Sequence, residues 1–194
     1  KAFSKDNCIT SMVSTSGATA DLAGKTVNLP QATNRPPNGT YTYAYMVILN
    51  EFGLKGTISL AGNVYCSTNS GGVNNSAGCT AVDHTEEIDD FGDTSFSAFY
   101  PGDARTSVSM PGGGAVTALL VKNDLSTASQ ASDSQKLIGL FSTDVNNKVV
   151  ITDSTNGLEM ELSVTDLGYG ISFDGNGEVE DFGSMPFQPI FNIF

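Results

Sequence analysis

The chain has 194 residues, of which 39% are hydrophobic and 9% aromatic, so it can bury the core of one domain. Its 21 acidic and nine basic residues give a net charge of −12, and the basic residues are scattered singly along the sequence. Nucleic acids and anionic membrane surfaces are bound by clustered Lys and Arg, so this composition excludes both as partners. The sequence contains no apolar run of about 20 residues, the length that a transmembrane segment needs.

Short segments rich in Thr, Tyr, Val and Ile alternate with Gly, Asn and Ser, a spacing typical of antiparallel β-proteins. The sequence therefore predicts a single-domain, all-β fold, either an antiparallel sandwich of the jelly-roll kind or an up-and-down barrel. We assign residues 1–35 to an N-terminal arm or edge-covering segment and residues 36–183 to the β-rich core. Residues 184–194 form an apolar C-terminal tail that docks on its own core or on a neighbouring molecule.

Residues 40–49 form the clearest predicted strand, since they follow a Pro-Pro-Asn-Gly turn signal and are rich in Tyr and aliphatic side chains. At a sheet edge, the apolar run 43–49 would pair readily with another chain. We expect residues 55–65 to return as the next strand, after a turn over residues 50–53.

Two cysteines, Cys66 and Cys79, enclose a loop of Gly, Asn, Ser and Thr in which Val73 and Ala77 are the only other residues. Burial cannot hold such a loop in shape, whereas a disulfide would contribute about 3 kcal/mol by restricting the unfolded chain. Disulfides persist in oxidising compartments, so we expect a secreted extracellular protein, or one in a periplasm or on a cell surface. The remaining cysteine, Cys8, is either a buried thiol or a residue that bonds to another chain.

An acidic run occupies residues 83–93, and we take Asp89, Asp90 and Asp93 as its candidate metal ligands. Carboxylates this close repel one another, so the run is either a solvated surface loop or a site for a divalent cation. His84 is the only histidine. A single His offers too few ligands for zinc or copper, so we expect His84 to have a structural or surface role.

The remaining predicted strands are 95–100, 106–110, 115–122, 136–143, 148–153, 158–164, 171–174 and 178–182, followed by the tail after residue 185. Residues 124–135 form either a short helix or a polar loop. We expect hairpin turns at Asn146-Asn147 and Asn156-Gly157, because Asn and Gly adopt positive φ readily.

The segment after residue 173 places oxygen-bearing side chains at alternate positions between glycines. Its candidate metal ligands are Asp174, Asn176, Glu178, Glu180 and Asp181. Calcium binds six to eight oxygens, so this segment makes calcium the one cofactor that the sequence suggests. The alternative is a β-hairpin turn over residues 174–177 that leads into a charged edge strand.

The C-terminal tail carries three Phe and two Ile and has no charged residue. Chain ends are normally polar, so these side chains need a partner, either in the same domain or on a neighbour that accepts an added strand. The candidate interface residues are Phe187, Ile190, Phe191, Ile193 and Phe194, together with Cys8.

Motifs typical of catalysis are missing from the sequence, which has neither a Gly-x-Ser-x-Gly nucleophile motif nor any Trp on which a sugar could stack. We therefore favour a non-enzymatic role, that of a secreted structural or assembly subunit of a fibre, surface layer or matrix. Such a subunit would associate with itself or with another extracellular protein through its apolar terminal segments. The alternatives are a secreted β-barrel that binds a small apolar ligand and a hydrolase whose loop is supported by calcium.

Overall fold

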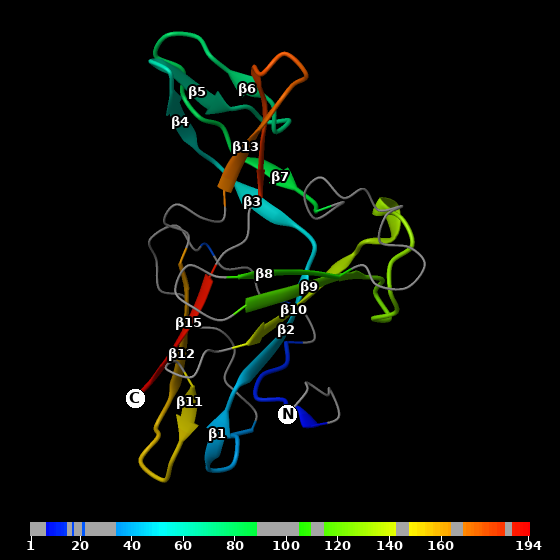
Figure 1. The fold of residues 1–194 in the computed structure, drawn as a ribbon, viewed down its shortest axis with the longest axis vertical. Coiled ribbons are helices and arrows are strands. Elements are labelled where there is room, and N and C mark those ends of the chain that lie inside the picture. Colours follow the sequence, from blue (N-terminus) through cyan, green and yellow to red (C-terminus); the bar gives the residue numbers. More distant parts are fainter. Residues whose placement is uncertain are drawn as a thin grey trace.

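The computed structural model describes residues 7–14, 17, 21, 34–88, 105–109, 115–142, 148–163, 169–184 and 188–194, the backbone alone for 105–109, 162–163 and 188–189. These residues form antiparallel strands in several open sheets, and none of the sheets within the described ranges closes into a barrel (Figure 1). The predicted all-β antiparallel fold is confirmed, and the open sheets agree with a sandwich rather than a barrel. In the same ranges, no helix is long and apolar enough to cross a membrane.

The strands and the short 3₁₀ helix are numbered in chain order. They are β1 (Gly39–Tyr41), β2 (Tyr43–Leu49), β3 (Phe52–Leu54), β4 (Thr57–Leu60), β5 (Asn63–Ser67), β6 (Val73–Asn74), β7 (His84–Glu86), β8 (Arg105–Ser109), β9 (Ala115–Val121), the 3₁₀ helix Ala131–Asp133, β10 (Lys136–Ser142), β11 (Val149–Ile151), β12 (Leu158–Ser163), β13 (Tyr169–Phe173), β14 (Val179–Ser184) and β15 (Gln188–Ile193).

The largest sheet has four strands in the order β2-β10-β9-β8, all antiparallel. β10 lies in its centre and pairs along its whole length with β2 on one side and β9 on the other. β2 lies at one edge, the position in which we expected its apolar run to favour pairing with another chain. The N-terminal segment lies near this strand, because Cys8 acts on Tyr45. The pKa of Tyr45 is raised mainly by burial and, to a lesser extent, by the electrostatic effect of the Cys8 sulfur.

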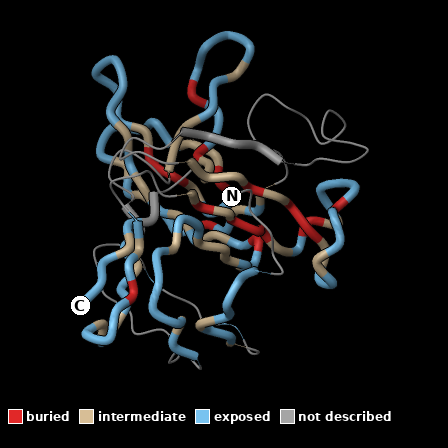
Figure 2. Tube along the Cα trace, turned by 60° about the horizontal axis from the view of Figure 1, so that its bottom comes forward, coloured by how far each residue is buried: buried red, intermediate tan, exposed pale blue. Residues whose placement is uncertain are grey.

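The core of this part of the molecule lies on the four-stranded sheet. Leu120 and Leu137 are buried there with Ala118 and Ala128, and Ile48, Phe52 and Ile88 pack against them. Figure 2 shows the buried residues concentrated along the central strands, while the outer hairpins are mostly exposed. The apolar runs of the central strands β9 and β10 are therefore buried, whereas no residue of the edge strand β2 is.

Asn50 joins three segments at the end of β2. Its side-chain amide nitrogen donates hydrogen bonds of 2.8 Å to the carbonyl oxygens of Ile88 and Ser134, and its side-chain oxygen accepts one of 2.9 Å from the Ile88 N–H. Asn50 is only 3% exposed. Because a buried polar side chain is costly unless it is hydrogen-bonded, this arrangement holds β2 firmly against the segments after β7 and before β10.

A second group of strands occupies the upper end of the molecule in Figure 1 and comprises β3–β7, β4–β5–β6 and β13–β14. β14 joins this group because the Phe182 N–H donates to the Gly71 carbonyl at 2.9 Å and Gly72 forms a bridge with Asp181. Phe182 is 1% exposed and stacks on Tyr169, with ring centroids 5.1 Å apart. The Tyr169 ring in turn covers Gly56, where an added Cβ would lie 2.3 Å from it.

The predicted return strand over residues 55–65 is wrong. The chain turns at Ala61 and Gly62, both with positive φ, so residues 57–60 and 63–67 form the hairpin β4–β5. β2 pairs instead with β10, far along the sequence. Residues 52–54 form the separate strand β3, which pairs with β7.

Two further predictions concern segments that connect the strands, and the first of them is wrong. Asn156-Gly157 does not close a hairpin, because β11 pairs with β1 and β12 with β15. Of the two alternatives for residues 124–135, the polar loop is confirmed, with a single 3₁₀ turn at Ala131–Asp133. The predicted strand 95–100 and the predicted turn at Asn146-Asn147 lie outside the described residues.

Candidate functional site

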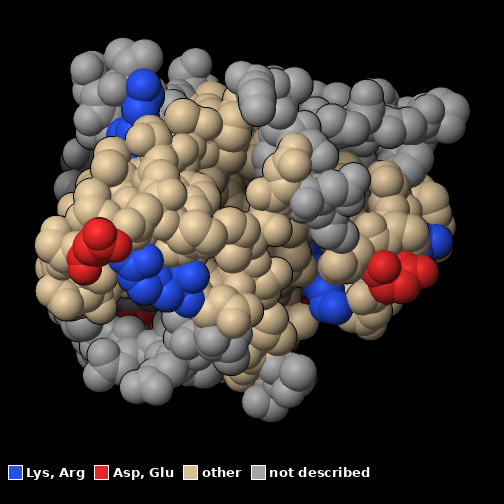
Figure 3. All heavy atoms as spheres, turned by 90° about the horizontal axis from the view of Figure 1, so that it is seen from below, with Lys and Arg blue, Asp and Glu red and all other residues tan. Residues whose placement is uncertain are grey.

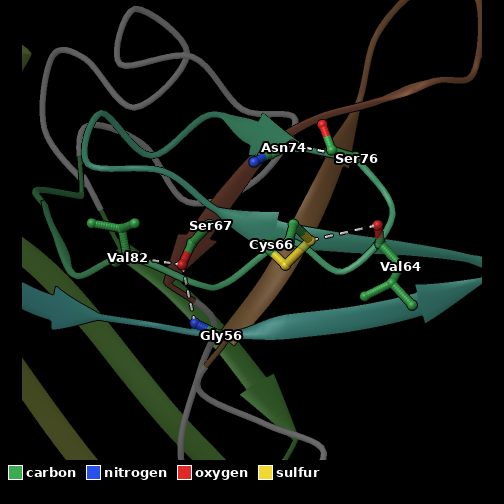
Figure 4. Close-up of a disulfide and its surroundings, with 8 residues drawn as sticks. Gly56, Val64, Cys66, Ser67, Asn74, Ser76 and Val82 are labelled. Carbon is green, nitrogen blue, oxygen red and sulfur yellow. Dashed lines mark hydrogen bonds between the residues drawn. A yellow bond between two sulfur atoms is a disulfide. The ribbon is translucent and has the colours of Figure 1, made fainter.

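Cys66 and Cys79 form the predicted disulfide, with their Cα atoms 6.1 Å apart. The neighbouring Ser67 connects two other segments of the chain (Figure 4). Its hydroxyl donates a hydrogen bond to the Val82 carbonyl at 2.8 Å and accepts one from the Gly56 N–H at 3.2 Å. Cys66 is fully buried at the end of β5. The disulfide therefore braces the upper group of strands, where a Gly- and Asn-rich loop supplies little apolar surface of its own.

The segment proposed for calcium contains a tight turn between β13 and β14. The Asp174 carboxylate accepts hydrogen bonds from the N–H groups of Asn176 at 2.9 Å and Glu178 at 2.8 Å, and from the Asn176 side-chain amide at 3.1 Å. Gly177 has a φ of +81°, and its N–H donates to the Asp174 carbonyl. The hairpin turn that we weighed against a metal site is thus present, and Asp174 is its main acceptor.

The other candidate ligands are placed less favourably for a shared ion. Glu180 and Asp181 lie in β14, where both are exposed. Among the described residues, no group of three or more His, Cys, Asp and Glu side chains could hold a metal ion. Asp89, Asp90 and Asp93 lie outside the described residues. Calcium binding stays a prediction.

Replacing Asp174 by Asn is expected to remove a contribution to stability that depends on pH. The Glu178 N–H and then the Asn176 groups hold the pKa of this carboxyl below its ordinary value, against the opposing effect of burial. A carboxyl whose pKa is lowered in the folded state contributes its full stabilisation at pH values above its unfolded pKa of about 3.9. That contribution is lost as the pH falls through the folded pKa. Urea unfolding of both proteins at neutral and acidic pH should therefore show a difference that shrinks in acid. An equal difference at both pH values would contradict this assignment.

The same two proteins test the calcium prediction. If Asp174 is a calcium ligand, added calcium should raise the Tm of the natural protein above its value in chelator, and Asp174→Asn should abolish that rise. Equal Tm values of the natural protein in calcium and in chelator would leave the hairpin turn as the only role of Asp174.

His84 in β7 is a buried polar residue. It is 5% exposed, and neither of its ring nitrogens has a hydrogen-bond partner within the described part of the chain. An added Cβ at Gly71 would lie 3.5 Å from the imidazole and 3.8 Å from a Glu86 carboxylate oxygen, so both side chains lie against this glycine. Elsewhere among the described residues, the Ser184 hydroxyl on β14 is also buried without a hydrogen-bond partner. The expected structural or surface role of His84 stays a prediction, and its burial favours the structural one.

A polar hollow of about 340 Å³ lies where β2 and β10 meet their adjoining loops. Its lining includes Asn50, Glu51, Glu87, Asn123 and Gln135. Carboxylate and amide side chains suit a polar guest, so this hollow does not fit the small apolar ligand that the sequence left open.

The C-terminal tail forms β15 and pairs antiparallel with β12 in a two-stranded ribbon. The register places Leu158 opposite Ile193 and Met160 opposite Phe191. Because directly opposed residues share a face, these four apolar side chains lie on one face of the ribbon. We call these four residues the apolar ribbon face; Phe194, next along the chain after Ile193, lies on the opposite face of the ribbon. Figure 1 shows the ribbon at the lower left, beside β11.

Several side chains of the apolar ribbon face are open to solvent. Leu158 is 47% exposed and Ile193 36%, and on the other face Phe194 is 67% exposed. The Phe194 ring covers Gly157, where an added Cβ would lie 2.3 Å from the ring, and the two residues exchange backbone hydrogen bonds. The end of the chain is therefore held in place while its apolar side chains remain uncovered.

The ribbon also separates the tail residues that we grouped as one interface. Phe191 and Ile193 share the apolar ribbon face, whereas Ile190 lies opposite Glu161 on the other face. Phe187 lies outside the described residues. Cys8 is exposed and lies near Tyr45 of β2. The sequence analysis missed Leu158 and Met160, although their alternation with Glu159 and Glu161 is the signal that could have identified them.

The charges visible on the surface do not form a large patch. In the view from below, Figure 3 shows the basic residues and the acidic residues in small separate groups among uncharged residues. Comparison with known proteins gives no relative: no protein-family model, curated protein or solved structure matches the chain.

Proposed function

We propose that this protein is a structural subunit of an extracellular assembly and that copies of the chain associate through the apolar ribbon face. The observation that carries the proposal is the exposure of Leu158 and Ile193, which lie directly opposite each other on one ordered ribbon. Isolated exposed apolar residues are ordinary, but several on one rigid element favour a contact with another molecule.

Two features support this role. Phe194 and its neighbours are fixed by backbone hydrogen bonds to Gly157, so little conformational freedom remains to be lost on association. The Cys66–Cys79 disulfide supports an oxidising location outside the cytoplasm, where such an assembly would operate. Neither feature requires a catalytic residue or a bound cofactor.

Replacing Leu158 and Ile193 together by Ser is expected to weaken self-association about 100-fold. Each side chain that is buried at the contact should contribute about 1.4 kcal/mol, which corresponds to a factor of about ten in the dissociation constant. Native mass spectrometry of the two proteins over the same concentration series measures this change.

A matched control uses Phe173 and Val64, which are exposed to similar degrees, 52% and 43%, on β13 and β5. Replacing these two by Ser should leave the distribution of multimers unchanged. An equal loss of multimers in both double variants would contradict a role for the ribbon, and thermal unfolding of both variants shows whether each is folded.

A further inference from the structure

We propose that the outer edge of β12 binds an extended segment of a different protein in which basic and apolar side chains alternate. The segment would add a third strand to the β12–β15 ribbon, with its apolar side chains beside the apolar ribbon face and its basic side chains beside Glu159 and Glu161. This site is the strand edge, so it does not depend on self-association through the face.

Among the described strands, the outer edge of β12 is unpaired. β12 pairs there with β15 alone, and β11 lies close to β15. In an antiparallel pair about half of the backbone N–H and C=O groups of a strand point away from its partner. Across six residues, β12 therefore presents a row of backbone donors and acceptors that an incoming strand can satisfy.

The side chains of β12 define what such a strand should contain. Leu158 and Met160 point to one face, and Glu159 and Glu161 point to the other, where both glutamates are exposed. Within the described residues, neither glutamate forms an ion pair with Lys or Arg. Directly opposed side chains of opposite charge stabilise a strand pair, so basic residues two positions apart complement this edge.

A second copy of this chain does not meet that requirement. If two β12 strands paired antiparallel with their apolar faces together, registers centred on residues 159, 160 or 161 would oppose glutamate to glutamate, which is destabilising. Elsewhere in the sequence, no two of the nine Lys and Arg residues stand two positions apart. The complementary segment therefore belongs to another protein.

The test uses the whole chain and three labelled ten-residue peptides, two composed of Lys and Val and one composed of Glu and Val. One peptide alternates Lys with Val, the second has the same composition with all Lys before all Val, and the third alternates Glu with Val. Fluorescence anisotropy should show the first peptide binding at least tenfold more tightly than the second and third. Methylating the backbone nitrogens of alternate residues, which removes strand hydrogen bonds, should abolish its binding.

Substitutions assign the binding to β12. Glu159→Gln with Glu161→Gln should weaken the alternating Lys peptide about tenfold, and Glu159→Lys with Glu161→Lys should transfer the preference to the alternating Glu peptide. The control is Glu51→Gln with Glu87→Gln, which removes two exposed glutamates outside the β12–β15 ribbon and should leave binding of the peptide unchanged.

Three results would overturn the proposal. They are equal binding of the two Lys peptides, an equal loss in the control variant, and no measurable binding of the alternating Lys peptide at low salt. Self-association is read separately from the mass of the protein without peptide, so its failure would leave this result intact.

Discussion

Replacing Phe182 by Ala is expected to lower the free energy of unfolding by about 3–5 kcal/mol. Phe182 is 1% exposed and is the largest fully buried side chain among the described residues, and it stacks on Tyr169 at 5.1 Å between ring centroids. Its removal would leave a cavity between β14 and the loop at Gly71, where the Phe182 N–H forms its backbone hydrogen bond. In the described part of the upper group of strands, Cys66 and Val179 are the only other buried hydrophobic residues, and both are too small to fill that cavity. Urea unfolding at neutral pH measures the change.

Phe173 provides the matched control, because it lies on the paired strand β13 and is 52% exposed. Phe173→Ala should cost much less than Phe182→Ala, since an exposed ring forms few contacts to lose. Equal losses in the two variants would mean that Phe182 does not organise the packing of this part of the fold.

Removing the disulfide by replacing both Cys66 and Cys79 with Ala is expected to lower the free energy of unfolding by about 3 kcal/mol. The two residues are 13 positions apart and enclose the Gly- and Asn-rich loop, so the cross-link chiefly restricts the unfolded chain. Reducing the natural protein should produce a comparable loss. Equilibrium unfolding with and without reductant gives both values.

Cys8→Ser is the control for the disulfide, because Cys8 is exposed and lies outside the bridged loop. The free energy of unfolding of Cys8→Ser should stay close to that of the natural protein. On reduction it should fall by the same amount as that of the natural protein. A double variant that unfolds at the same urea concentration as the natural protein would show that the loop is held by its hydrogen bonds alone.

Strands with strong apolar patterns could be predicted from the sequence, but their partners could not. The runs at residues 115–121 and 136–142 are dense in Val, Leu and Ile, and both became central strands. The pairing of β10 with β2 joins residues about 90 positions apart, and local patterns carry no information on such a contact. The hairpin β4–β5 was missed because Ala61 adopts a positive φ, which is uncommon for a residue with a side chain.

The candidate site was predicted in part. The absence of charge in the tail marked it as a segment that needs a partner, and the structure supplies β12. Alternation along a strand separates Ile190 from Phe191 and Ile193, but only the register shows that the latter two lie opposite Met160 and Leu158. The disulfide was predictable because the composition of its loop excludes other sources of order. His84 illustrates the opposite case, since nothing in the acidic run around it indicates a buried imidazole.

The central claim, association through the apolar ribbon face, is tested most directly by sedimentation velocity of the natural chain alone, from low to high micromolar concentration. The account predicts a sedimentation coefficient that rises with concentration, and it predicts that the rise is lost when Leu158 and Ile193 are replaced by Ser. A monomer with the same sedimentation coefficient at every concentration would contradict it.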